Sequence, residues 1–369
     1  SEAVLAAMRL ARTVSGRTKV VTFTNDYHGL FDEVLARGVA SGEGRRSIPI
    51  APGIPQHIPS EMVVLDYGEP ESLAYIESIA SEVAAVLVEP VQSRHPDLQP
   101  VEFLRDLRAL TQEHDLALIF DEMITGFRSH PGGIQELFGI RADLVTYGKV
   151  IGGGFPIGVV SGRHEYMDAL DGGHWQYGDD SIPEADVTWF AGTFVRHPIA
   201  LAASRASLQH LHDAGPALQT DLNQRTTAFV NELSEFLAEE RAPMSIEHFS
   251  SFFLTKFHAA HEFSSLFYFY LRDHGIHVTE GRSAFLSTAH DEQDFDRLTA
   301  AYKAAVRDMQ EAGFLPRERA AGVALPSASG LVPLSEGQQE IWLATQIGAE
   351  VNCAYNLCNT VDLSGPLDV

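Results

Sequence analysis

Lysine is the residue type whose placement is most informative about chemistry in this chain. Four lysines occur among 369 residues, at positions 19, 149, 256 and 303. Lys149 closely follows the apolar run Leu144–Tyr147 and precedes the glycine run Gly152–Gly154. Glycines let a ligand approach the backbone, and the end of a buried strand is where an α/β enzyme places a Schiff-base lysine. An ordinary lysine at a strand end would fit the same pattern.

An acidic residue stands at the end of the preceding apolar run. Asp121 follows Leu116–Phe120, where a buried carboxylate is costly unless a cation or several hydrogen-bond donors accompany it. A structural carboxylate that caps a helix would satisfy this requirement, and a protonated pyridine nitrogen would do so as well. Because a carboxylate and a lysine at the ends of consecutive strands match the pair that binds pyridoxal phosphate (PLP), we expect a PLP site here.

The elements that must position these side chains are predicted from apolar runs. Six strands are expected, at Lys19–Thr24, Met62–Tyr67, Val83–Val91, Leu116–Met123, Leu144–Tyr147 and Ile157–Ser161. Several of them are apolar at consecutive positions, which indicates burial on both faces of a mainly parallel sheet. Helices at Glu71–Ser81 and Val101–His114 provide crossover connections. The predicted fold class is therefore α/β.

The rest of the chain suggests further domains. We expect a large domain over residues 1–205, a smaller α+β domain over 206–316, a linker over 317–332 and a new domain from 333 to 369. Predicted elements of the smaller domain include Phe252–Phe257 and Asp291–Ala312. The aromatic segment Phe263–Leu271 is assigned to its core in preference to an acyl-chain groove. Ser1 fits a helix N-cap without a preceding strand, so we expect a segment of a longer protein that lacks the N-terminal part of the large domain.

Six ordered motifs give a specific family resemblance. They are Ser1–Ala3, Tyr27–Gly29, Glu89–Val91, Phe120–Arg128, Gly148–Gly154 and Ala191–Phe194. Over residues 1 to about 315 the chain resembles the class III aminotransferases, particularly the glutamate-1-semialdehyde aminomutase branch. The resemblance implies a fold-type I PLP-dependent transferase. It also implies that Lys149 binds the cofactor covalently and moves protons, and that Asp121 pairs with the pyridinium nitrogen.

The same resemblance implies further cofactor contacts. Tyr27 would lie against the cofactor ring, and His28, which follows it, is also expected to bind the cofactor. Ser1, at a helix N-terminus, would bind the phosphate with the help of the helix dipole. Gln92 lies where some class III members place a glutamine near the ring hydroxyl, and the aminomutases differ there. Thr193 would reach the phosphate bound by a neighbouring subunit, which implies a homodimer.

The tail resembles a different family. Pro333–Leu343, Ala354–Asn356 and Leu363–Leu367 are similar to the first motif of nonribosomal peptide synthetase condensation domains. A plain amphipathic helix packed on the aminotransferase would also fit the first of these segments. The condensation-domain interpretation is favoured because the motif follows a linker and is followed by a matching Gly-Pro-Leu.

Together the resemblances imply the aminotransferase domain of a hybrid polyketide–nonribosomal peptide synthase of the mycosubtilin and microcystin type. Such a domain would aminate a β-ketoacyl chain held as a carrier-protein thioester, with glutamate or glutamine as amino donor. Two alternatives stay open. One is a free-standing glutamate-1-semialdehyde 2,1-aminomutase of tetrapyrrole synthesis, and the other is a non-catalytic PLP-binding module.

Composition restricts the partners and the location. Fifty acidic and 26 basic residues leave a formal charge of −24, which disfavours nucleic-acid phosphates and anionic lipid surfaces. The two cysteines, Cys353 and Cys358, both lie near the end of the sequence, so most of the chain folds without a disulfide. We therefore expect a cytoplasmic protein. Zinc-type spacings of histidine and cysteine are absent from the sequence, so no metal site is expected.

Overall fold

A computed structural model describes residues 1–41, 44–258 and 263–317. Contacts along the chain define a compact unit, Ser1–Glu318, to which the fold below belongs. The predicted linker beyond residue 317 and the condensation-like tail lie outside the described residues. The predicted division at residues 205 and 206 falls within helix α6 (Pro198–Ala214) and stays a prediction.

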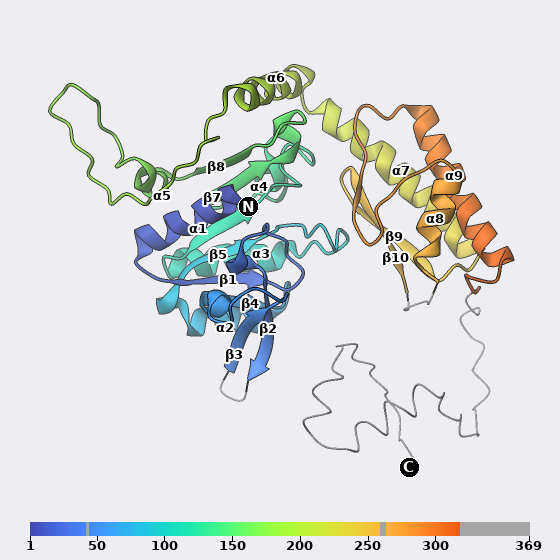
Figure 1. Ribbon diagram of the computed structural model, residues 1–369, viewed down its shortest axis with the longest axis horizontal. Coiled ribbons are helices and arrows are strands. Elements are labelled where there is room, and N and C mark those ends of the chain that lie inside the picture. Colours follow the sequence, from blue (N-terminus) through green and yellow to red (C-terminus); the bar gives the residue numbers. More distant parts are fainter. Residues whose placement is uncertain (42–43, 259–262, 318–369) are drawn as a thin grey trace, which may run out of the picture. The chain divides into compact units, whose positions relative to one another are not determined.

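The site-bearing part is built on a six-stranded sheet (Figure 1). Its order is β4-β1-β5-β6-β7-β8, and all neighbouring strands are parallel except β8, which is antiparallel to β7. The strands are β1 Lys19–Phe23, β4 Met62–Leu65, β5 Val83–Val88, β6 Ala117–Asp121, β7 Leu144–Gly148 and β8 Gly158–Gly162. The predicted α/β class and mainly parallel sheet are confirmed.

Helices cover both faces of this sheet, as the consecutive apolar runs require. Every residue of β5 and β6 is buried. Val86 and Leu118 share one apolar cluster with residues of α2 (Pro70–Ser78) and α3 (Val101–Glu113). Their neighbours Ala85 and Ile119 belong to a second cluster with α1 (Glu2–Ser15). Alternate side chains of each strand therefore pack against helices on opposite faces.

Short elements complete this part of the chain. They are the hairpin β2 Ala36–Ser41 and β3 Gly44–Pro49, helix α4 Gly133–Phe138 and helix α5 His164–Met167. Residues 171–197 contain no helix or strand among the described residues and carry several exposed aromatic side chains. The sequence did not predict the hairpin.

The following part forms a second core around an antiparallel sheet of order β11-β10-β9. Its elements are α7 Ala217–Glu239, β9 Met244–Phe249, β10 Phe252–Phe257, α8 Leu266–Asp273, β11 Ala284–Phe285 and α9 Glu292–Glu311. Phe229, Phe253, Phe267 and Tyr302 are buried together in this core. The aromatic segment enters it through Phe267, Tyr268 and Leu271, whereas Phe269 is exposed. Among the described residues, no helix is both long and apolar enough to cross a membrane.

Candidate active site

Lys149 lies where β7 ends and a 3₁₀ turn, Lys149–Gly152, begins. Its backbone has φ 47°, a left-handed conformation that costs a non-glycine residue about 1–3 kcal/mol. The preceding residue, Gly148, leaves no room for a side chain, because an added Cβ would lie 2.9 Å from the Ile157 carbonyl oxygen. The local backbone therefore turns sharply and directs the lysine side chain off the strand end.

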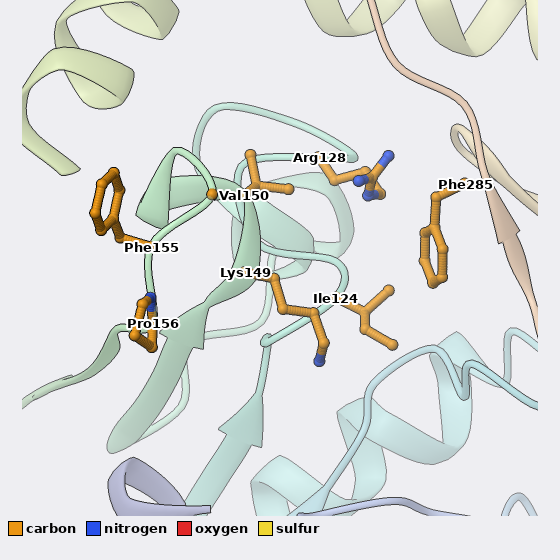
Figure 2. A pocket seen from close by; sticks show the side chains of 8 residues that line it. Ile124, Arg128, Lys149, Val150, Phe155, Pro156 and Phe285 are labelled. Carbon is orange, nitrogen blue, oxygen red and sulfur yellow. The ribbon is translucent and has the colours of Figure 1, made fainter. Parts of the chain in front are cut away.

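The lysine lines a pocket of about 640 Å³ (Figure 2). The lining residues are Ile124, Arg128, Lys149, Val150, Gly154, Phe155, Pro156 and Phe285. Figure 2 shows Arg128 and Phe285 on one side of Lys149, and Phe155 and Pro156 on the other. The pocket therefore offers one amine and one guanidinium among walls that are otherwise apolar.

Electrostatics favour a reactive amine at this position. Burial lowers the pKa of the Lys149 ammonium, and Arg128 acts in the same direction, whereas Asp121 and Glu89 oppose the shift. Across residues 1–41, 44–258 and 263–317, the Lys149 amine has neither a hydrogen-bond nor an ion-pair partner. A neutral, unpartnered amine is the form that attacks a carbonyl carbon.

Asp121 ends β6 and is 4% exposed. Its Oδ1 accepts hydrogen bonds from the Met123 backbone N–H at 3.2 Å and from the Thr146 hydroxyl at 3.1 Å. Its Oδ2 lies 2.9 Å from Nδ1 of His28. The β6–β7 register pairs Asp121 with Thr146, three residues before Lys149, so the sheet itself brings the two predicted chemical residues to one edge.

His28 links Asp121 to a second buried acid. Its Nε2 lies 3.2 Å from Oδ2 of Asp26 and 3.0 Å from the Thr22 hydroxyl. Burial disfavours the charged imidazole, but hydrogen bonds and ion pairing with the two aspartates outweigh it and raise the pKa of His28 to about 10. The imidazole is therefore held as a cation between two carboxylates.

The buried side chain of Gln92 donates a hydrogen bond to this cluster. Its Nε2 donates to Oδ1 of Asp26 at 2.7 Å and to the Thr24 carbonyl oxygen at 2.9 Å. The structure thus places the Gln92 amide nitrogen on the acid next to His28. A contact with the cofactor's ring hydroxyl, as the resemblance implied, stays a prediction.

The remaining predicted residues lie in more open positions. The Ser1 hydroxyl caps no N–H of α1, although Ser1 is its N-cap residue, and instead accepts the Leu30 N–H at 2.9 Å. Tyr27 is 44% exposed, and its backbone N–H donates to Oε2 of Glu89 at 2.8 Å. Thr193 lies in the exposed segment 171–197 and does not line the pocket in this chain. Hydrogen bonds therefore connect Asp121, His28 and, through Asp26, Gln92, and the sheet register places Lys149 at the same edge. Tyr27 lies on the loop whose Leu30 N–H contacts Ser1 at the start of α1.

Three residues of the site were not assigned by sequence reasoning. Asp26 lies three residues after the end of β1, and Glu89 directly follows β5, so the signal that identified Asp121 could have identified both. Arg128 ends the motif Phe120–Arg128, but no function was predicted for its side chain. Its Nη1 donates to the Ser251 hydroxyl and to the Leu286 carbonyl oxygen, each at 2.9 Å.

The fold and site define a fold-type I PLP-dependent transferase, and comparison with known proteins gives the family. The sequence model described as aminotransferase class-III matches residues 1–288. A glutamate-1-semialdehyde 2,1-aminomutase from Aquifex aeolicus is 34% identical over 325 residues, covering 84% of this chain and 73% of that protein. The chain belongs to the class-III aminotransferases, and it is a PLP-dependent enzyme.

Solved structures agree with this assignment. An omega-transaminase from Sphaerobacter thermophilus superimposes with a TM-score of 0.74 at 28% identity, covering 84% of this chain and 72% of that one. A β-phenylalanine aminotransferase from Variovorax paradoxus gives a TM-score of 0.70 at 28% identity, covering 86% and 70%.

The donor set fits PLP. A lysine amine with a lowered pKa suits the cofactor's aldehyde, and a buried carboxylate held by three donors suits its ring nitrogen. When bound, PLP supplies an electron sink for breaking bonds at the substrate's amine-bearing carbon. We propose that Lys149 moves the proton at its Nζ, that Asp121 holds the cofactor's ring, and that the apolar walls exclude water.

Glu89 makes stability depend on pH. Burial, reinforced by the charge of Asp26, raises the pKa of Glu89 from 4.5 to about 8. Between these values the unfolded chain has lost a proton that the folded protein keeps, so rising pH favours unfolding. His28, with its pKa raised from 6.5 to about 10, acts in the same direction above pH 6.5.

We therefore expect Glu89 alone to reduce the free energy of unfolding of the cofactor-free protein by up to about 1.4 kcal/mol per pH unit between about pH 5.5 and 7.5. His28 and the buried Glu122, whose pKa is raised to about 7, add to this slope. Urea unfolding at several pH values measures it, with Glu89→Gln as the comparison. The variant should show a clearly smaller slope, and parallel pH profiles for the two proteins would contradict the assignment.

Proposed function

We propose that this enzyme aminates a β-ketoacyl chain that is held on a carrier protein as a phosphopantetheine thioester. The observation that carries the proposal is the lining of the Lys149 pocket. Among the described lining residues, only Lys149 and Arg128 bear a charge, and Ile124, Phe155 and Phe285 are large and apolar. Apolar walls suit an acyl chain.

Two further observations support the same substrate class. The structurally similar enzyme from Variovorax paradoxus is named for β-phenylalanine, an amino acid whose amine is on the β-carbon. The segment Pro333–Leu343, similar to the start of a condensation domain, would place the amination directly before a peptide-bond-forming module. A tethered chain arrives at high effective concentration, so tight binding of a free acid is not required. The donor in this proposal is glutamate or glutamine.

We also propose a homodimer in the cytoplasm, with Thr193 of one subunit serving the site of the other. The exposed segment supports an interface, because Tyr177, Trp189 and Phe194 are 98%, 79% and 77% exposed in the single chain. Exposed aromatic clusters of this kind favour contact with another protein surface. Sedimentation of wild-type protein and of a Trp189→Ser variant would test the association.

The second candidate function is glutamate-1-semialdehyde 2,1-aminomutase, because relatives with that name are 31–37% identical to this chain. The two candidates separate in one experiment. Intact-protein mass spectrometry of a loaded carrier should show the keto-to-amine mass change when PLP-loaded enzyme and glutamate are added. Free glutamate-1-semialdehyde should be converted at least about tenfold more slowly, because that small substrate gains nothing from tethering. Rapid formation of 5-aminolevulinate with an unchanged carrier-bound chain would establish the aminomutase instead.

A further inference from the structure

The cluster around His28 contains one acid more than is needed to hold the cofactor's ring nitrogen. Asp26, His28 and Asp121 are all buried, and the two aspartates contact opposite nitrogens of the imidazole. Asp121 would suffice to hold the ring nitrogen of the cofactor, so the presence of Asp26 calls for a separate explanation.

We propose that Asp26 is a positioning residue: it binds the outer nitrogen of His28, fixes the imidazole as a two-proton donor, and so leaves the Asp121 carboxylate charged for the cofactor's ring nitrogen. The inference deepens the proposed site and rests on the role proposed there for Asp121.

The hydrogen-bond geometry carries the argument. An ionised carboxylate only accepts hydrogen bonds, so a carboxylate at each ring nitrogen requires a proton on both nitrogens. The alternative is a neutral imidazole with one of the two acids protonated. Protonation of Asp26 is disfavoured because both of its carboxylate oxygens accept other hydrogen bonds. Gln92 Nε2 donates to Oδ1, and the Glu89 backbone N–H donates to Oδ2 at 3.4 Å.

Protonation of Asp121 is disfavoured for the same reason. The Met123 N–H and the Thr146 hydroxyl point to Oδ1, and His28 points to Oδ2. Both acids are thus held in the form that accepts hydrogen bonds, and the imidazole between them keeps two protons. Without Asp26, the ring could satisfy its Nε2 by accepting a hydrogen bond from the Thr22 hydroxyl, which lies 3.0 Å away.

Burial raises the pKa of Asp26, whereas its hydrogen bond and ion pair with His28 oppose that shift. Glu89 faces Asp26 and His28, and burial raises its pKa to about 8, so its neutral form adds no further negative charge near pH 7. Lys149 faces Asp121 and Glu89 from the end of β7. Tyr67 is buried next to Asp26, and its raised pKa keeps the phenol neutral.

The proton count of His28 tests the proposal without any assay of the loaded enzyme. The cofactor-free full chain is labelled with ¹⁵N-histidine, and His28→Gln identifies the His28 signals by their loss. Both ring nitrogens of wild-type His28 should be protonated at pH 7.5. In Asp26→Asn the midpoint of His28 titration should fall by about 1–3 pH units, the effect of removing one close opposite charge.

Matched variants separate this role from a general structural one. Asp66→Asn removes an exposed aspartate just after the neighbouring strand β4 and should leave His28 unchanged. Asp26→Glu should restore part of the shift. If circular dichroism shows that Asp26→Asn does not fold, Gln92→Leu removes a donor to Asp26 and should lower the midpoint in the same direction. The dissociation constant for PLP should rise about tenfold in Asp26→Asn.

Two results would overturn the inference. A single proton on wild-type His28, or an unchanged midpoint in Asp26→Asn, would show that Asp26 does not set the protonation of the ring. A shifted midpoint together with unaltered PLP affinity in Asp121→Ala would show that the proposed role of Asp121 is wrong, and the purpose assigned to Asp26 with it.

Discussion

Lys149→Ala is expected to abolish amino transfer, with a loss of at least about 10²–10⁴-fold in turnover. The variant lacks the amine that faces the pocket and that we propose attaches the cofactor and moves the proton. No other described lysine lines that pocket: Lys19 pairs with Glu82, and Lys303 pairs with Glu232. Single-turnover measurements with the donor amino acid would record the loss.

The matched control is Lys303→Ala, which removes a half-buried amine from α9, outside the pocket, and should retain wild-type turnover. A Lys149→Ala enzyme that kept more than a tenth of the wild-type rate would show that the lysine is an ordinary strand-end residue.

Asp121→Ala is expected to weaken PLP binding about 10- to 100-fold and to slow the first half-reaction. It removes a charge-assisted hydrogen bond worth about 1.5–3 kcal/mol and leaves the Thr146 hydroxyl and His28 without their acceptor. Fluorescence titration of the cofactor-free protein gives the dissociation constant, and rapid mixing with the donor gives the rate.

Asp143→Ala is the control for destabilisation alone. Asp143 is as buried as Asp121 but precedes β7, at the other end of the strand from Lys149, and binds Arg108 and Arg163. It should lower stability without a specific loss of cofactor affinity. Equal affinity losses in the two variants would mean that Asp121 is a structural carboxylate.

Much of the fold follows from consecutive apolar residues. A run such as Ala84–Val88 fits a strand covered on both faces, and the six strands predicted in this way are all present. The hairpin Ala36–Ser41 and Gly44–Pro49 was missed because glycine, arginine and serine interrupt any alternation of apolar and polar residues. Edge strand β8 is antiparallel, which its apolar pattern does not reveal because burial is insensitive to strand direction.

The site residues that could be predicted from the sequence are those that lie at strand ends. Lys149 and Asp121 stand out because each follows an apolar run, and parallel strands bring such ends to one edge of the sheet. The contact between Asp26 and Gln92 joins residues 66 positions apart, and only the folded chain shows it. Arg128 was missed for the same reason, since its partners Ser251 and Leu286 are 123 and 158 positions away along the chain.

The attachment point of the cofactor tests the central claim most directly. The PLP-loaded protein is reduced with borohydride and digested, and the modified peptide is identified by mass spectrometry. The account predicts a reduced cofactor on Lys149 alone. A reduced cofactor on Lys19, Lys256 or Lys303, with Lys149 unmodified, would contradict it.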